Sequence, residues 1–331
     1  MTDDPRSLPW LRQASVQRRA PWQDSQEVRV SNWITPWDQI ERIDAGLIGA
    51  PYSGASISAS GAAGGPEAVR MAFRYNTTYS PDWETDIQKL VVRDLGDIAG
   101  HLTDVKAAHL HIEETIATVI THGGGFIPLL IGGDHSVTAP AVRGFCKAHP
   151  GKKVGVINID AHMDVRNMEH GPHNGTPFRQ IVEGLDQVDG RNVVELGIHG
   201  FMNAEPYHRW CAEQGITVIS GRQIQKRGMD ECISESLERA GDGADLIYLS
   251  VDIDCLAYPF TIGTSAASPE GLSAWQLLEA VFACGKNPKV QGFDVVEIDP
   301  SRDVKDLTAR TGCSAILTFL AGIRQRQLAA G

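Results

Sequence analysis

The feature that most constrains this chain is a repeated alternation of short apolar runs and helix-like stretches from residue 127 onward. The runs "IPLLIGG", "VGVINI" and "LIYLSV" are almost continuously apolar, which is typical of strands buried on both faces. Helical patterns such as "APAVRGFCKAH" and "SAWQLLEAVFACG" lie between such runs. This alternation favours a mainly parallel sheet covered by helices on both sides, that is, a three-layer α/β/α domain.

The chain has 331 residues, enough for one large α/β domain or two smaller ones. No linker or internal repeat interrupts the alternation, so we predict a single catalytic domain over residues 41–331. Residues 1–40 are polar and contain several prolines and tryptophans. We interpret them as an N-terminal arm that lies on the domain or on a neighbouring subunit.

Composition narrows the classes of partner. A net charge of -11 argues against nucleic acid or an anionic membrane as the main partner. The first twenty residues lack the apolar segment of a signal peptide, and no apolar run is long enough to span a bilayer. The six cysteines are scattered without a C-x-x-C pair, which favours reduced thiols. We therefore expect a cytoplasmic protein.

Polar side chains follow four of the apolar runs directly, where ligands bind in parallel α/β sheets. Within "NIDAHMDV" the acidic and histidine residues stand at every second position, so their side chains should point to one side. Taken singly, each of these residues could be a helix cap or turn residue. Together they bring imidazoles and carboxylates to neighbouring strand ends, and only cations make that arrangement tolerable. The candidates are His135, Asp160, His162, Asp164, Asp252 and Asp254.

These six side chains predict a metal centre. Carboxylates and imidazoles without a thiolate suit Mn, Zn, Ni or Fe. Six ligands with four negative charges are enough for two divalent metal ions per chain, and a pair of ions can make water a nucleophile at neutral pH.

Four motifs, in their order and spacing, resemble the signatures of the ureohydrolase superfamily, which includes arginase, agmatinase, formimidoylglutamase and guanidino-acid hydrolases. They are "GGDHS" (132–136), "DAHMD" (160–164), "SVDID" (250–254) and "VVEIDPSRD" (295–303). The resemblance implies an arginase-like fold, assembly as trimers or hexamers, and hydrolysis of a C–N bond in a guanidine or amidine.

The resemblance also implies residue roles. One ion would be held by His135, Asp160, Asp164 and Asp252, and the other by Asp160, His162, Asp252 and Asp254. Asp160 and Asp252 would bridge the two ions. Glu297 would bind the planar N–C–N group of the substrate. Asp254 and the metals would stabilise the intermediate, and Asp254 or a nearby shuttle would pass a proton to the leaving nitrogen.

Finer features resemble the formimidoylglutamase-like branch. In "HNGTPFRQ", Asn174 stands where arginases and agmatinases carry a proton-shuttling histidine, so the residue that replaces the shuttle is open. His173 is one candidate, although a surface position is the favoured interpretation for it. Asn174 itself is a candidate for binding the substrate.

The segment "CLAYPFTIGTSAASPEGLS" (255–273) departs from the family pattern. Ala257 replaces an aspartate there, and Tyr258 and Ile262 make a less polar wall. We expect Ala257 and Tyr258 to contact the substrate and to favour an alkylated guanidine or biguanide of the metformin type. Such a hydrolase could use Mn or Ni and could pair with a second ureohydrolase-like chain.

Three alternatives are open. Formimidoylglutamate is one substrate, with Arg179 as a cation for its carboxylates, and an agmatine-like guanidino compound is another. A non-catalytic partner subunit is an alternative of a different class.

Overall fold

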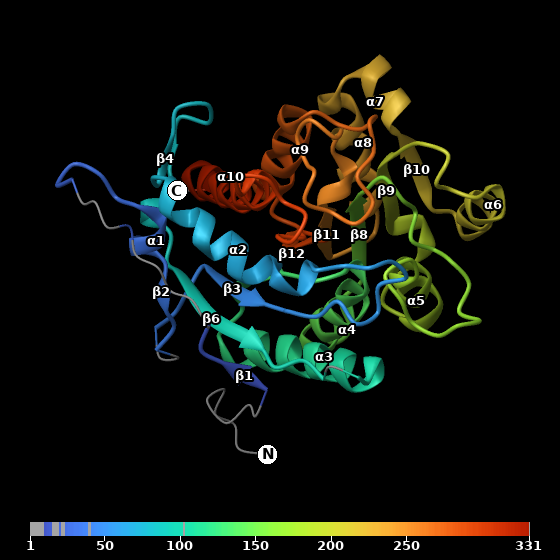
Figure 1. Ribbon diagram of the computed structural model, residues 1–331, viewed down its shortest axis with the longest axis horizontal. Helices are drawn as coiled ribbons and strands as arrows, with labels where there is room; N and C mark the ends of the chain where they lie inside the picture. Colours follow the sequence, from blue (N-terminus) through green and yellow to red (C-terminus); the bar gives the residue numbers. More distant parts are fainter. Residues whose placement is uncertain (1–9, 15–19, 21–23, 39–40, 102, 331) are drawn as a thin grey trace.

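A mainly parallel sheet forms the centre of the molecule in the computed structural model, which describes residues 10–14, 20, 24–38, 41–101 and 103–330 (Figure 1). The strands lie in the order β1-β6-β3-β7-β12-β11-β8-β9-β10, and β2 pairs with β6. Only β1 is antiparallel to its neighbour in this sheet, among the described residues. The strands are β1 Leu11–Arg12, β2 Thr35–Pro36, β3 Ala45–Gly49, β6 Val92–Ile98, β7 Ile127–Ile131, β8 Val154–Ile159, β9 Val193–Ile198, β10 Thr217–Ser220, β11 Leu246–Asp252 and β12 Val290–Val296; β4 Tyr79–Ser80 and β5 Thr85–Asp86 form a separate hairpin.

Helices cover both faces of the sheet, and each face has its own apolar core. In β7, for example, Leu129 and Ile131 face one core whereas Leu130 faces the other. The first core packs against α2, α7, α8, α9 and α10, and the second packs against α3, α4, α5 and α6. The helices are α1 Val30–Trp33, α2 Gly65–Ala72, α3 Val105–His122, α4 Thr138–Ala148, α5 Pro177–Gly184, α6 Glu205–Gln214, α7 Gly221–Arg227, α8 Met229–Gly241, α9 Ala274–Lys286 and α10 Leu307–Ala330.

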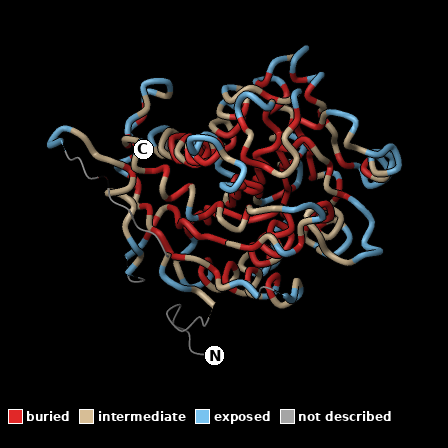
Figure 2. The backbone as a smooth tube through the Cα atoms, in the orientation of Figure 1, coloured by how far each residue is buried: buried red, intermediate tan, exposed pale blue. Residues whose placement is uncertain are grey.

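The predicted three-layer arrangement is therefore confirmed. Buried residues follow the central strands, and exposed ones lie on the outer loops and outer helix faces (Figure 2). Burial of every residue of β7, β8 and β9 explains why their sequences are almost continuously apolar rather than alternating, with Asn158 and Glu195 as buried polar exceptions.

Strand β6 was not predicted, because its sequence "VRDLGDI" carries three charged residues. The Arg70 side chain of α2 accounts for two of them: it donates hydrogen bonds to Asp94 at 2.8 and 2.9 Å and to Asp97 at 2.6 Å. Burying charged groups is tolerable when they are paired in this way.

The predicted arm, residues 1–40, lies partly outside the described residues. Its described parts follow the edge of the sheet: β1 and β2 both pair with β6, and Trp10 stacks on His111 with ring centroids 4.5 Å apart. The division at residue 40 stays a prediction. No helix in the described part of the chain is long and apolar enough to cross a membrane.

Candidate metal centre

The polar clusters meet at one edge of the sheet, at the carboxyl ends of the four neighbouring strands β7, β12, β11 and β8. His135 opens a short 3-10 helix after β7, and Asp160 directly follows β8. Asp252 ends β11, Asp254 lies in the 3-10 helix Ile253–Cys255, and Glu297 directly follows β12. Parallel strands thus bring residues that are far apart in the sequence to one place.

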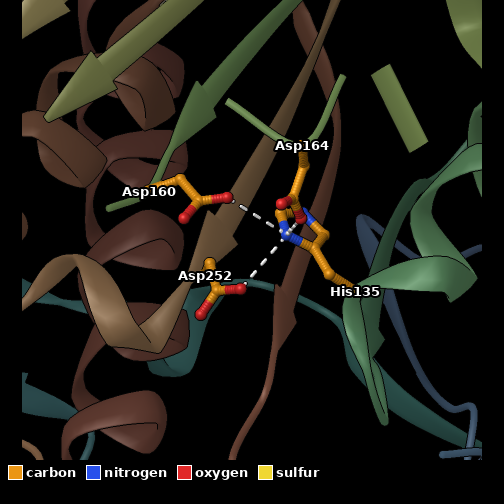
Figure 3. Close-up of side chains that lie close together, drawn as sticks. All are labelled: His135, Asp160, Asp164 and Asp252. Atoms are coloured by element: carbon orange, nitrogen blue, oxygen red, sulfur yellow. Dashed lines mark ion pairs between the residues drawn. The ribbon is translucent and has the colours of Figure 1, made fainter. Parts of the chain in front are cut away.

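His135 lies at the centre of the first cluster (Figure 3). Its Nδ1 atom is 3.2 Å from Asp160 Oδ2, 3.0 Å from Asp164 Oδ2 and 3.1 Å from Asp252 Oδ2. The four ligand atoms all lie within 4.8 Å of one another. His135, Asp160 and Asp252 are buried, so water does not screen the charges effectively.

A hydrogen-bond chain determines how the His135 ring is oriented. His135 Nε2 lies 3.0 Å from Ser250 Oγ, and this hydroxyl donates at 2.6 Å to Asp294. With its proton directed to Asp294, Ser250 accepts from Nε2–H, and the Nδ1 lone pair faces the three carboxylates. A lone pair among carboxylate oxygens requires a cation, and imidazole with carboxylates suits a divalent transition metal.

The second cluster contains Asp160, His162 and Asp254. His162 Nδ1 lies 3.5 Å from Asp160 Oδ1 and 3.2 Å from Asp254 Oδ2. Burial lowers the pKa of His162, but the carboxylates of Asp254 and Asp160 outweigh this and raise it to about 12. The field at this imidazole therefore favours a positive charge, which a bound metal ion also supplies.

The structure brings together all six residues predicted as ligands, in two adjacent groups. Asp160 belongs to both groups, as expected for a bridging ligand. Asp252 belongs only to the first group, and its Oδ1 accepts the Asp254 backbone N–H at 2.9 Å. Among the described residues, Asp160 is thus the one carboxylate that belongs to both groups.

Glu297 lies beside this cluster and is buried. Its Oε1 accepts the His135 backbone N–H and the Asn174 side-chain N–H, both at 3.0 Å. Among the described residues, its Oε2 has only a long contact of 3.5 Å with Ser265 Oγ. Burial, followed by the charge of Asp134, raises the pKa of Glu297 to about 8.

Two of these residues have left-handed backbones, with φ of 46° at Asp164 and 63° at Glu297. This conformation is unfavourable for residues with a Cβ atom, and such residues often occur at functional sites.

A cavity of about 360 Å³ opens onto the metal centre. Four of the predicted ligands line it together with Glu297 and Asn174. The remaining wall includes Ile57, Met202, Ala266 and the exposed side chain of Arg166. The cavity is therefore polar at its metal end and partly apolar at its sides, and it has a cation in its wall.

Ala257 and Tyr258 are not among the described residues that line this cavity. Ala257 N–H donates to the Leu272 carbonyl, and Tyr258 N–H donates to the Ser268 carbonyl. The Tyr258 side chain is 54% exposed. The loop reaches the cavity later, through Ser265 and Ala266.

Arg179, suggested as the cation for substrate carboxylates, is engaged elsewhere. It donates to the Val165 carbonyl, pairs with Glu183 at 2.7 Å and stacks over Trp210 at 4.1 Å. The arginine that lines the cavity is instead Arg166, and within the described residues no carboxylate pairs with it. Its position two residues after Asp164 continues the alternation of the motif and could have signalled it.

His173 is likewise not among the described lining residues; its Nδ1 accepts the Gly175 backbone N–H at 3.1 Å. Asn174 does line the cavity, and its Oδ1 accepts the Ile57 backbone N–H at 3.1 Å.

Comparisons with known proteins agree with this geometry. The sequence profile of the arginase family matches residues 43–322. A formimidoylglutamase from Halalkalibacterium halodurans is 38% identical over 305 residues, which cover 92% of this chain and 94% of the relative. The crystal structure of formimidoylglutamase from Bacillus subtilis has a TM-score of 0.87 at 33% identity and covers 96% of this chain and 97% of that chain. A Trypanosoma cruzi formiminoglutamase crystallised with Mn²⁺ has a TM-score of 0.83 at 27% identity and covers 91% of this chain and 99% of that chain.

Proposed function

This chain belongs to the arginase family, and from that premise we propose that its substrate is an amidine that bears carboxylates, with formimidoylglutamate as the leading example. The protein is a ureohydrolase, a metal-dependent hydrolase that acts on C–N bonds of linear amidines. The products of formimidoylglutamate would be glutamate and formamide.

Arg166 is the observation that carries the choice of substrate. It lines the same cavity as Glu297 and the predicted metal ligands, and no carboxylate of the described chain pairs with it. A free guanidinium fits a carboxylate by charge and by paired hydrogen bonds. The formimidoylglutamases among the relatives act, by name, on a substrate that has both an amidine and carboxylates, which supports the proposal.

We assign the metal ligands as the sequence suggested: His135, Asp160, Asp164 and Asp252 for one ion, and Asp160, His162 and Asp254 for the other, with Asp252 as its further ligand. Two divalent ions there would supply the Lewis acidity that makes water a nucleophile at neutral pH. The Mn²⁺ in the trypanosomal structure supports manganese rather than nickel.

The protein side chains then have separate tasks. Glu297 would accept hydrogen bonds from the positively charged amidine through Oε2, because its Oε1 is already held by His135 and Asn174. The positive charge of the bound amidine would oppose the raised pKa of Glu297 and keep its carboxylate ionised. Asn174 would position Glu297, and Asp254 would carry the proton to the leaving nitrogen. Arg166 would hold the carboxylate end and thereby align the C–N bond.

An alkylated guanidine or biguanide has less support. That hypothesis depended on Ala257, Tyr258 and Ile262, and none of the three is among the described residues that line the cavity. A cationic biguanide offers no carboxylate to Arg166 and would be repelled by its charge. Assembly as a trimer or hexamer, with copies of itself or with related chains, stays a prediction, as does a cytoplasmic location.

The test compares two substrates in two proteins. Arg166→Ala should lower kcat/KM for formimidoylglutamate by about 10- to 150-fold, the equivalent of 1.5–3 kcal/mol for a hydrogen bond to a charged group. N-propylformamidine, which lacks carboxylates, should react equally well with both proteins. Arg209→Ala, which removes an exposed arginine, is the control. Turnover of metformin by wild type together with none of formimidoylglutamate would reject the proposal in favour of the biguanide.

A further inference from the structure

A buried amide and a buried carboxyl group lie directly behind Asp160. Asn158 is on β8, two residues before Asp160, and Glu195 is its register partner on β9. Both side chains are fully buried. Asn158 Nδ2 lies 2.7 Å from Glu195 Oε2 and 3.1 Å from Asp160 Oδ2, so its two N–H groups can bond to both carboxyl groups at once.

We infer that Asn158 and Glu195 form a positioning pair that sets the orientation of Asp160 between the two metal ions. The inference rests on the proposed metal centre, but not on the identity of the substrate. Neither residue is a ligand in this assignment; both act through Asp160.

Asp160 needs such control more than the other carboxylates do. Among the described residues, Asp160 belongs to both groups of candidate ligand atoms, with Oδ2 toward His135 Nδ1 and Oδ1 toward His162 Nδ1. The His162 backbone N–H donates to Oδ1 at 2.7 Å, and Asn158 donates to Oδ2 at 3.1 Å. One donor on each oxygen prevents the carboxylate from rotating, and Glu195 in turn prevents the amide from rotating.

A second observation ties the pair together. Asn158 Oδ1 and Glu195 Oε1 are both buried, and neither has a hydrogen-bond partner among the described residues. Unpaired buried polar atoms are unfavourable because they have lost their hydrogen bonds to water. A proton on Glu195 would let its O–H donate to the Asn158 oxygen and would satisfy both atoms. Burial, reinforced by Asp160 and Asp164, raises the pKa of Glu195 well above its ordinary value.

The simplest competing explanation is that the pair only ties β8 to β9. The backbones of these strands already pair in parallel from Val156–Val193 to Ile159–Leu196, so the sheet has its own bonds at this place. Replacing both polar partners with apolar groups of similar size is nearly neutral for stability. The double variant N158L/E195L should therefore fold, which separates positioning from structure.

The experiment measures metal binding without substrate. The metal-free wild type, N158L/E195L, Glu195→Gln and Asn192→Leu are titrated with Mn²⁺ against a fluorescent chelator, and Co²⁺ absorption reports ligand geometry. N158L/E195L should bind metal about 10- to 100-fold more weakly, with an altered Co²⁺ spectrum and an unchanged Tm of the metal-free protein. Glu195→Gln keeps the shape of the side chain and its hydrogen bonds to Asn158, so this variant should bind metal like the wild type. Asn192→Leu removes an amide that donates hydrogen bonds to the Arg239 and Asp242 carbonyls, away from the metal centre, and this variant should also bind metal like the wild type.

Wild-type affinity and spectrum in N158L/E195L would overturn the inference, as would a Glu195→Gln variant that loses as much as the double variant. If N158L/E195L does not fold, Glu195→Leu alone is compared with Glu195→Gln by the same titration, and equal affinities overturn the inference. Failure of the wild type to bind two ions would instead overturn the metal centre, and with it the proposed function.

Discussion

Replacing Glu297 with glutamine should slow catalysis and leave the metals in place. Glu297 Oε1 accepts N–H groups from His135 and Asn174, which leaves Oε2 for the substrate. In Glu297→Gln the two donors will retain the amide oxygen, so the new NH₂ group must take the place of Oε2. An amidinium N–H would then meet a donor instead of a negatively charged acceptor.

The size of the effect follows from that exchange. A hydrogen bond to a charged group contributes about 1.5–3 kcal/mol, which corresponds to a fall in kcat/KM of about 10- to 150-fold. The metal content should not change, because Glu297 belongs to neither group of candidate ligands. The close contacts within the first group join His135 to Asp160, Asp164 and Asp252.

Glutamate release gives the rate, and elemental analysis of the purified protein gives the metal content. Glu270→Gln, a change of an exposed glutamate, is the matched control and should leave both unchanged. A loss of metal in step with activity would show that Glu297 supports the ions and does not bind the substrate.

Three further predictions concern the metals and pH. Asp252→Ala should lose metal and reduce kcat/KM by orders of magnitude, and full activity of a thoroughly chelated wild type would refute the metal-dependent mechanism. Ser250→Ala should weaken metal binding about 10- to 100-fold in a chelator competition, because His135 loses its hydrogen-bond partner; unchanged affinity would contradict this. Burial, followed by the charge of Arg143, lowers the pKa of His109 to about 4. Between pH 6.5 and 4 the unfolded chain therefore binds a proton at His109 that the folded protein does not. The free energy of unfolding falls by about 1.4 kcal/mol per pH unit over this range. His109→Gln removes this loss, and its Tm should fall less steeply than that of the wild type between pH 6.5 and 4; equal slopes would refute the assignment.

The central strands and the candidate ligands could be predicted from the sequence because both depend on local sequence pattern. Continuous apolar runs mark strands buried on both faces, and the spacing of acidic and histidine residues in "DAHMD" marked the candidate ligands. The strand period is not what brings these side chains together, because β8 ends at Ile159 and Asp164 has a left-handed backbone. Strand β6 escaped prediction because its compensation, Arg70 on α2, lies 24 residues from Asp94 in the chain. A single sequence does not show which charges will be paired.

The residues that line the cavity also could not be predicted from local sequence pattern. Tyr258 follows the ligand Asp254 by four residues, which suggested that it would be near the substrate. An isolated β-bridge pairs Ala257 with Ser268, and this part of the loop faces solvent. The loop lines the cavity only further along the chain, at Ser265. Arg166, in contrast, follows Asp164 by only two residues and lines the cavity together with it.

The order of the strands also has a consequence for folding kinetics. The ligands come from β7, β8 and β11, and β12 lies between β7 and β11 although it is the last strand in the chain. No contiguous part of the chain before β12 can therefore assemble the complete centre, and pairing of such distant parallel strands is slow. Metal ions that bind only the finished sheet stabilise it after the folding barrier has been crossed. We expect bound metal to lengthen the lifetime of the folded protein by slowing unfolding, with little effect on the folding rate.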